Sequence, residues 1–393
     1  MDNTIPTARL HALDNLRALM MWLGIVLHVA AIHMVQNSPL PWADDKRTTA
    51  ADLTVAFIHA FRMPVFFILG GFFVAMLLAS RGPAGMAKHR AIRLGLPFAV
   101  FWLPLLMVTV AAALLFIYQI ERGTWGLDMG LVDVRAAKAH LPHLPRGPNT
   151  MHMWFLWMLL WMSLATAMLA QWLPTRVWAV PAQWLRRAAS AWWGPLVLAL
   201  PLVATDAGYP KGFLYPSGAF IPPPAEWLHN GLFFIMGLAI FSVRTQIFES
   251  WTRHARWFAA AGAVTFIVSG ALVKREMAAP FALAYGLTTW FWSIAVIAAG
   301  LRWLPTRSPV LGYLSDSSYW VYLVHFPLTI AFGSLLYLTD LPALLKMLLN
   351  ITATTFVCVA TYHLFVRYTW VSVLLNGKRH TRAPRPPAAL TPA

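Results

Sequence analysis

The chain has 393 residues, of which 59% are apolar and 11% charged, and its mean hydropathy is +0.61. An ordinary soluble domain has about 25% charged residues, so this chain has too little polar surface for a water-soluble protein. It is also too apolar to remain disordered. The single cysteine, Cys358, excludes a disulfide framework and a cysteine-built metal site. The composition therefore indicates a polytopic membrane protein.

Ten apolar segments are each long enough to cross a membrane as a helix, because a hydrocarbon core about 30 Å thick needs roughly 20 helical residues. The predicted spans are 16–36, 51–80, 94–119, 151–172, 191–206, 226–243, 255–273, 280–301, 310–336 and 341–366. We expect one all-α membrane domain over residues 1–376 and a disordered, basic, proline-rich tail over 377–393. A partly re-entrant path is the alternative for 191–243, since five prolines occur in 207–225.

The net charge of +16 is divided unevenly between the two sides of these spans. With the N-terminus inside, 18 Lys and Arg residues fall on the inner side and nine on the outer side. Basic residues accumulate on the cytoplasmic side of membrane proteins, so both termini are predicted to be cytoplasmic. The scattered charge forms no single basic face, which argues against nucleic acid as a partner and leaves membrane lipids as the surroundings.

Three predicted helices carry ionisable side chains deep in the membrane, where such groups are costly and are functional candidates. Arg17 and His28 are eleven residues apart in the first span, so they share one helix face about 16 Å apart. His59 and Arg62 occupy neighbouring sides of the second span, and the ninth brings His325 to a similar depth. Because one hydrated cavity costs less than three separate defects, His28, Arg62 and His325 are expected to meet in a cavity open toward the cytosol.

Two further polar residues share the predicted helix face of His325. Tyr322 lies three residues before it and Ser318 seven residues before it. On the cytoplasmic side of the third span, Arg90 and Arg93 are one helical turn apart. Such a pair either sets membrane orientation or binds a phosphate.

Structural roles are the alternatives for these residues. Arg17 suits a positive-inside anchor, and a buried histidine is often a neutral, hydrogen-bonded residue. Arg62 can instead pair with a carboxylate such as Asp52. No carboxylate reaches a span centre, which disfavours a proton- or cation-coupled transporter.

The acidic residues of the first outer loop give one metal alternative. Asp44 and Asp45 can hold a metal for lipid-linked glycosyl transfer, although two adjacent acids in a turn are commonly a solvated pair. We therefore predict no metal site.

Several blocks of sequence occur together in a recognisable order over nearly the whole chain. They are residues 13–17 with His28 following Arg17 after ten intervening residues, 61–73, 90–97, 152–156 and 318–328. In these blocks the chain resembles the membrane-bound acyltransferase family 3, and within it the glucans biosynthesis protein C branch.

The resemblance implies an enzyme of the bacterial inner membrane that moves an acyl group from cytoplasmic acyl-CoA to a hydroxyl of a periplasmic glucan or another surface carbohydrate. In the glucans branch the group is succinyl, with succinyl-CoA as co-substrate and no tightly bound cofactor. The implied catalytic residues are His28 as general base, Arg62 at the oxyanion or the succinyl carboxylate, and His325 as a second proton relay. The implied donor-binding residues are Arg17, Arg90 and Arg93, and the acceptor-orienting residues are Tyr322, His59 and Ser318.

Two other functional classes stay open at this point. A membrane exporter or flippase for an anionic glycan also needs buried arginines but transfers no acyl group. A purely structural membrane subunit would tolerate the loss of His28. Within the enzyme class, direct attack by the sugar hydroxyl and an acyl-histidine intermediate are both compatible with the sequence.

Overall fold

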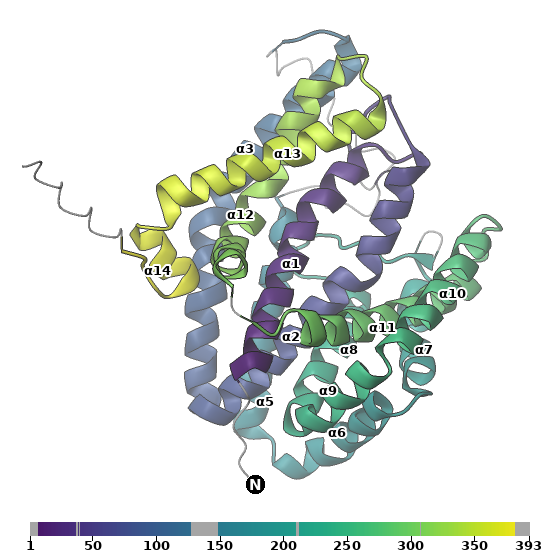
Figure 1. Cartoon of the computed structure of the whole chain (residues 1–393), viewed down its shortest axis with the longest axis vertical. Helices are drawn as coiled ribbons and strands as arrows, with labels where there is room; N and C mark the ends of the chain where they lie inside the picture. The colour runs from purple at the N-terminus through teal and green to yellow at the C-terminus, as the bar shows by residue number, and fades with distance from the viewer. Residues whose placement is uncertain are drawn as a thin grey trace, which may run out of the picture.

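A computed structural model of the protein describes residues 7–36, 38, 40–126, 148–209, 212–306 and 308–381. Within these ranges the chain forms helices and no strand, so the predicted all-α fold is confirmed (Figure 1). The α-helices are α1 (Thr7–Ile32), α2 (Thr49–Arg90), α3 (Leu96–Arg122), α5 (Trp154–Trp172), α6 (Thr175–Ser190), α7 (Gly194–Asp206), α8 (Pro224–Ile240), α9 (Arg244–Arg253), α10 (Ala255–Val273), α11 (Ala278–Trp303), α12 (Pro309–Tyr337), α13 (Ala343–Thr361) and α14 (Trp370–Asn376). Short π-helical or 3-10 turns are η1 (Ala91–Gly95), η3 (Met151–Met153), η5 (Phe241–Val243) and η6 (Tyr362–Val366).

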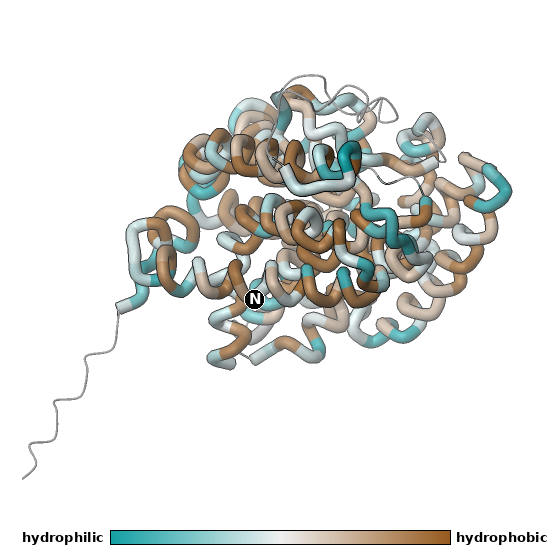
Figure 2. The backbone as a smooth tube through the Cα atoms, turned by 90° about the horizontal axis from the view of Figure 1, so that it is seen from above, coloured by the Kyte–Doolittle hydropathy of each residue, from teal (hydrophilic) through white to brown (hydrophobic). Residues whose placement is uncertain are grey.

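Most of these helices are long and apolar enough to cross a membrane. In the described part of the chain eight stretches meet this condition, or nine if the bent pair α6 and α7 counts as one span. The eight are His11–Ile32, Thr49–Arg122, Met151–Trp172, Pro224–Arg253, Ala255–Val273, Ala278–Trp303, Pro309–Tyr337 and Ala343–Val366. Figure 2 shows hydrophobic residues along the helices and hydrophilic residues mainly near their ends and in the connections. The protein is a multi-pass membrane protein.

The stretch Thr49–Arg122 contains two of the predicted spans, 51–80 and 94–119. As one straight helix its 74 residues would extend about 110 Å, more than twice the thickness of a bilayer with its headgroups. The helical path breaks at Gly82, which has φ of 68° and ψ of 175°, a conformation open to glycine. The π-helical turn η1 then leads into α3. These breaks allow α2 and α3 to cross separately, as predicted.

The segment predicted as a span over 191–206 does not cross by itself. Its helix, α7, has 13 residues and is about 20 Å long, which is shorter than a hydrocarbon core of about 30 Å. It is bent by 118° from the preceding helix, α6. Gly194 begins α7 where a side chain would collide with the carbonyl oxygen of Ala188. The sharp turn therefore requires a glycine and produces a broken or re-entrant element.

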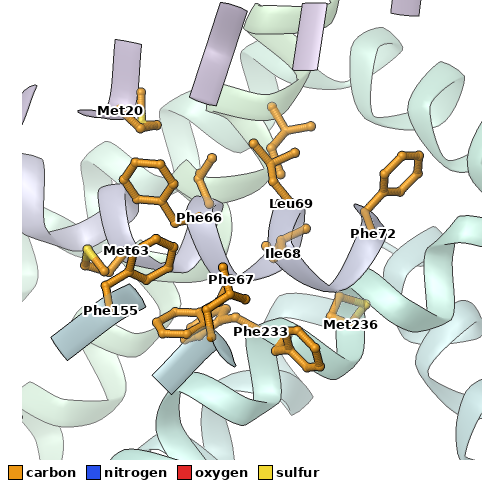
Figure 3. Packing of buried hydrophobic residues seen from close by; sticks show 14 of the residues in the cluster. Met20, Met63, Phe66, Phe67, Ile68, Leu69, Phe72, Phe155, Phe233 and Met236 are labelled. Atoms are coloured by element: carbon orange, nitrogen blue, oxygen red, sulfur yellow. The ribbon is translucent and has the colours of Figure 1, made fainter. Parts of the chain in front are cut away.

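Helices α1 and α2 form the centre of the bundle around which the others pack (Figure 1). α1 contacts α2, α11, α12 and α13, and α2 contacts α5, α8 and α11. A side chain at Gly71 of α2 or at Gly237 of α8 would collide with a carbonyl oxygen of the other helix, so these helices lie in close backbone contact. Figure 3 shows aromatic and methionine side chains filling the remaining space. Phe61 and Met63, the neighbours of Arg62 in α2, belong to this packed cluster.

The first residues of the predicted tail are attached to the bundle. Lys378 and His380 pair with Asp316 of α12 at 2.8 and 3.1 Å. Asn376 donates a hydrogen bond to the carbonyl oxygen of Asp316 at 2.8 Å. The remainder of the tail predicted to be disordered, residues 382–393, lies outside the described residues.

Candidate active site

Two cavities lie toward opposite ends of α1. The first, which we call the arginine cavity, has a volume of about 500 Å³ and surrounds the N-terminal half of α1, η1 and the start of α12. Its acidic and basic lining residues are His11, Asp14, Arg17, His89, Arg90, Arg93, Asp316 and Lys378. This size and this excess of cations suit an anionic ligand.

Arg90 is a cation of the arginine cavity whose buried nitrogens lack partners. Its Nε and Nη2 atoms are buried and make no hydrogen bond to any described residue. Arg17, in contrast, is 43% exposed and forms an ion pair with Asp14 at 3.4 Å. A buried guanidinium without partners is costly, and a phosphate would satisfy it through charge-assisted hydrogen bonds.

Arg93 lines the same cavity but is engaged elsewhere. Its Nη1 donates hydrogen bonds to the carbonyl oxygens of Val373 and Leu374 at 3.1 and 3.2 Å. These carbonyls belong to the last turn of α14, and that of Val373 also accepts a hydrogen bond from the backbone amide of Gly377. Arg93 therefore holds α14 against the cavity wall, and this role competes with the donor contact predicted for it.

The second cavity, which we call the histidine cavity, has a volume of about 470 Å³ and surrounds the C-terminal half of α1. Its polar and ionisable lining residues include His28, His59, Arg62, Thr109, His152, Tyr322 and His325. The structure thus brings His28, Arg62 and His325 from three helices into one cavity, as their depths indicated.

The expected opening of this cavity toward the side of Arg17 is not found. Its lining continues instead to Leu40, Trp42 and Tyr215, which belong to connections at the opposite end of α1. Phe66 and Phe155 line both cavities and separate them. The single chamber expected from the sequence is therefore two chambers, because two aromatic rings fill the space between them.

Arg62 and His325 face the same small space beside α1. The Nε of Arg62 donates a hydrogen bond to the carbonyl oxygen of Met20 at 2.8 Å, which fixes the guanidinium against α1. A Cβ atom on Gly24 would lie 2.6 Å from Nη2 of Arg62 and 3.0 Å from Nε2 of His325. Glycine at position 24 is therefore what allows the two side chains to approach α1 together.

The alternative ion pair between Arg62 and Asp52 is absent. The two carboxylate oxygens of Asp52 accept hydrogen bonds from the backbone amides of Val35 and Gln36, each at 3.0 Å. Among the described residues no carboxylate lies within ion-pair distance of Arg62. Its positive charge is thus directed into the cavity without a neutralising side chain.

Backbone hydrogen bonds fix the tautomer of His325. Its Nδ1 lies 2.9 Å from the carbonyl oxygen of Val321 and 2.8 Å from that of Tyr322. Since carbonyl oxygens only accept, Nδ1 carries the proton and Nε2 of the neutral ring carries a lone pair. This Nε2 atom is buried and has no hydrogen-bond partner. It is a proton acceptor beside a cation.

Two other histidines contact His325. The ring centroids of His28 and His325 are 5.3 Å apart, and those of His152 and His325 are 5.5 Å apart. His152 donates from Nε2 to the carbonyl oxygen of Leu323 at 2.9 Å, so its buried Nδ1 also has a free lone pair. His152 occurs in the block 152–156, but it stands at a helix start, so depth along a span gave no reason to select it.

The residues predicted to orient an acceptor are divided between the two cavities. Tyr322 lines the histidine cavity and donates its hydroxyl to the carbonyl oxygen of His152 at 2.9 Å. His59 lines this cavity as well. Ser318 lines the arginine cavity, and its hydroxyl donates to the carbonyl oxygen of Ser315 at 2.8 Å. It shares a helix face with His325 but lies about 10 Å nearer the start of α12. It is therefore on the other side of the aromatic pair from His325.

Several buried polar atoms of the histidine cavity lack partners among the described residues. They are Nε1 of Trp42, Oγ1 of Thr109, Nδ1 of His152 and Nε2 of His325. Buried polar groups in native proteins are almost always hydrogen-bonded to protein or water. The cavity is therefore suited to water or to a ligand that carries several hydroxyl groups.

A side chamber adjoins the histidine cavity at His59, Met63 and Trp154. Its volume of about 30 Å³ is enough for one or two water molecules. Nδ1 of His229 lies 2.9 Å from the Asp206 carboxylate, which accepts its hydrogen bond. We did not predict this pair, since Asp206 ends a broken helix and 23 residues separate it from His229.

The loop between α1 and α2 is anchored by a buried ion pair. Lys346 of α13 contacts both carboxylate oxygens of Asp44 at 3.0 Å, and the two side chains are 0% and 1% exposed. Burial and a hydrogen bond with Asp45 raise the pKa of Asp44 to about 6, and the hydrogen bond and positive charge of Lys346 oppose this rise. The alternative of a metal site at Asp44 and Asp45 is therefore disfavoured, because Lys346 occupies the Asp44 carboxylate.

Replacing Lys346 with methionine is expected to destabilise the protein by about 3–5 kcal/mol, because it leaves the buried Asp44 carboxylate unpaired. Thermal unfolding in detergent measures the effect. The double variant Lys346→Met with Asp44→Asn should recover much of the loss, whereas Lys274→Met, at an exposed lysine, should change little. A Lys346→Met protein as stable as the parent would show that the pair does not hold the loop.

Comparison with known proteins gives the family. A family model described as an acyltransferase domain, of the acyltransferase 3 type, matches residues 10–363. The chain belongs to this acyltransferase family. Glucans biosynthesis protein C of Salmonella gallinarum and that of Salmonella paratyphi B are each 25% identical to it over 396 aligned residues, covering 96% of this chain and 97% of the relative. No solved structure matches the chain.

The acyltransferase thus has a cationic cavity and a histidine-lined cavity with an aromatic pair between them. Among its described residues no three His, Cys, Asp or Glu side chains are grouped as metal ligands. Its histidine cavity offers proton acceptors at His28, His152 and His325 and a positive charge at Arg62. General base catalysis and oxyanion stabilisation are the two tasks that acyl transfer requires.

Proposed function

We propose that this acyltransferase moves an acyl group from cytoplasmic acyl-CoA to a hydroxyl of a periplasmic carbohydrate across the bacterial inner membrane. The observation that carries the proposal is the pair of cavities, one cationic and one lined by histidines, toward opposite ends of α1. The excess of Lys and Arg on the side of the arginine cavity supports a cytoplasmic location of that side and of both termini. The name of the relatives supports a glucan acceptor, and the resemblance to their branch supports a succinyl group.

The donor occupies the arginine cavity in this proposal. Arg90, with its unpartnered buried nitrogens, binds the phosphates of CoA, and Arg17 at the mouth assists it. The thioester then points along α1 toward Arg62. Arg93 contributes by holding α14 in place.

The acceptor occupies the histidine cavity, whose unpartnered polar atoms suit a sugar. His28 takes the proton of the attacking hydroxyl as its oxygen bonds to the thioester carbonyl carbon. Arg62, held by the carbonyl oxygen of Met20, stabilises the resulting oxyanion, and His325 beside it serves as a second proton relay. The tetrahedral intermediate then loses its C–S bond, and the thiolate takes the proton from His28, giving the ester and free CoA.

Mass spectrometry of periplasmic and surface glycans tests this function. Cells that make the wild-type chain should acylate a glycan, and His28→Ala should reduce acylation by about 10²–10⁴-fold, the usual contribution of a general base. His363→Ala provides the matched control, because His363 is exposed and lines neither cavity. Full acylation with His28→Ala would exclude His28 as the base. Glycan export that depends on the chain without acylation would favour an exporter.

Acyl transfer measured in isolated membranes, with the acyl-CoA concentration varied, tests the donor site separately. Arg90→Gln should raise the KM for acyl-CoA about tenfold at similar kcat, because it removes one charge-assisted phosphate contact. Arg81→Gln is the control, since Arg81 is an exposed residue of the same helix outside the arginine cavity. An unchanged donor dependence would remove Arg90 from the site.

A further inference from the structure

One aromatic pair lies at the boundary between the two cavities. Among the described residues, Phe66 of α2 and Phe155 of α5 are the lining residues common to both cavities. Their ring centroids are 4.9 Å apart, and the side chains are 3% and 4% exposed. Figure 3 shows the two rings close together beside Met63. At this spacing the rings are in van der Waals contact, so no water-sized gap lies between them.

The neighbours of each ring hold the pair in place without making hydrogen bonds to it. Phe155 packs against Phe67 at 5.1 Å and Tyr322 at 6.3 Å between ring centroids. The Arg62 guanidinium carbon lies 5.8 Å from the centroid of Phe66, which is a cation–π distance. All of these contacts are apolar or cation–π. A side-chain rotation at Phe66 or Phe155 therefore breaks no hydrogen bond.

The reacting groups lie on the far side of this pair from the cationic site. Arg62, His28 and His325 line the histidine cavity, whereas Arg90 lines the arginine cavity. If phosphates are held at Arg90, a reactive carbonyl has to cross the wall that the two rings share in order to reach Arg62. Rotation of the rings opens a narrow path, which is wide enough for a linear, flexible arm such as pantetheine and too narrow for a phosphorylated nucleoside.

We propose that Phe66 and Phe155 form a septum, a closed wall between the two cavities. The linear arm of the thioester donor pushes the two rings apart as it passes between them. This inference rests on the proposed function, which identifies the arm as the pantetheine of acyl-CoA. The septum keeps the two cavities sealed from each other when no donor is bound, which prevents leakage of small ions and water across the membrane. It also restricts the donor to unbranched arms, and it keeps water on the arginine side away from the thioester once the rings close around the arm.

Cysteine labelling tests the seal without any donor. Cys358 is 0% exposed, so a Cys358→Ser background carries single reporter cysteines. Ser315→Cys reports on the arginine cavity and Thr109→Cys on the histidine cavity. A membrane-impermeant thiol reagent is applied to spheroplasts and to inverted vesicles, which expose opposite sides. Each reporter should react from one side only, and the two reporters from opposite sides.

Opening the septum should abolish this sidedness. Phe66→Ala and Phe155→Ala are expected to raise labelling of Thr109→Cys from the arginine side by roughly tenfold or more, because the lost ring leaves a gap larger than a water molecule needs. Phe67→Ala is the matched control, since Phe67 is buried beside Phe155 but lines neither cavity. Phe66→Leu and Phe155→Leu give a smaller gap if an alanine variant does not fold, with folding judged from normal labelling of Ser315→Cys.

Hydrolysis of acyl-CoA without acceptor gives the second measurement. Water then attacks the thioester carbonyl, the C–S bond breaks, and a free acid and CoA form. Phe66→Ala should increase this reaction relative to acyl transfer, whereas Phe67→Ala should not. Two-sided labelling in the wild type, or one-sided labelling in folded Phe66→Ala and Phe155→Ala proteins, would overturn the septum. A third outcome separates the seal from the donor. If the wild type is labelled from one side only, the alanine variants are labelled from both sides, and the protein does not use acyl-CoA, the septum stands and the proposed donor is refuted.

Discussion

Replacing Arg62 with lysine should reduce the kcat of acyl transfer by about 10²–10³-fold, the usual effect of losing an oxyanion donor. The Nε of Arg62 is committed to the carbonyl oxygen of Met20 at 2.8 Å, while Nη2 faces the space beside Gly24 and His325. A lysine ammonium cannot occupy both positions, since its donors lie on one atom. Steady-state kinetics in membranes with acyl-CoA and a glucan acceptor measure the change.

The two roles considered for Arg62 give different kinetic results. Stabilisation of an oxyanion predicts a lower kcat with both succinyl-CoA and acetyl-CoA, whereas binding of the succinyl carboxylate predicts a higher KM with succinyl-CoA alone. Arg253→Lys, at an exposed residue of α9, is the control. If Arg62→Lys kept the wild-type kcat with both donors, the guanidinium would have no part in the chemical step.

The helices and the membrane depth of the reacting groups could be predicted from sequence. Each apolar span is set by local composition and bilayer thickness, and the depth of a residue follows from its distance to the span end. This is why His28, Arg62 and His325 could be placed together before any contact was known. The short helix α7 was harder to predict, because its turn depends on the close approach of Gly194 to Ala188, a tertiary contact.

The parts of the site that sequence did not reveal depend on contacts between distant segments. Arg93 resembles a phosphate ligand next to Arg90, yet its hydrogen bonds go to α14, 280 residues away. Asp206 and His229 meet because a broken helix ends beside α8. The division of the predicted chamber depends on how α2 and α5 set Phe66 against Phe155. The hydrophobic pattern of the sequence specifies none of these three contacts.

Replacing Gly24 with alanine should lower acyl transfer by about 10²-fold or more without unfolding the protein, because misplacement by about 1 Å is enough for such a loss. The added Cβ would lie 2.6 Å from Nη2 of Arg62 and 3.0 Å from Nε2 of His325. Both atoms belong to the ends of side chains, so they can move away from α1. The substitution is therefore expected to disturb the geometry of the site and to leave the stability of the fold unchanged. Kinetics and thermal unfolding, measured together, separate the two effects.

Gly270→Ala is the matched control for this variant. Gly270 lies within α10, and a Cβ there would meet no atom within 4 Å. Alanine at an exposed helical position is expected to be neutral or stabilising by about 1 kcal/mol. Gly24→Ala should gain the same helix propensity, so a stable but inactive protein would locate the defect at Arg62 and His325. An active Gly24→Ala protein would mean that neither side chain needs its position beside α1, which would remove the geometric basis for an oxyanion site there.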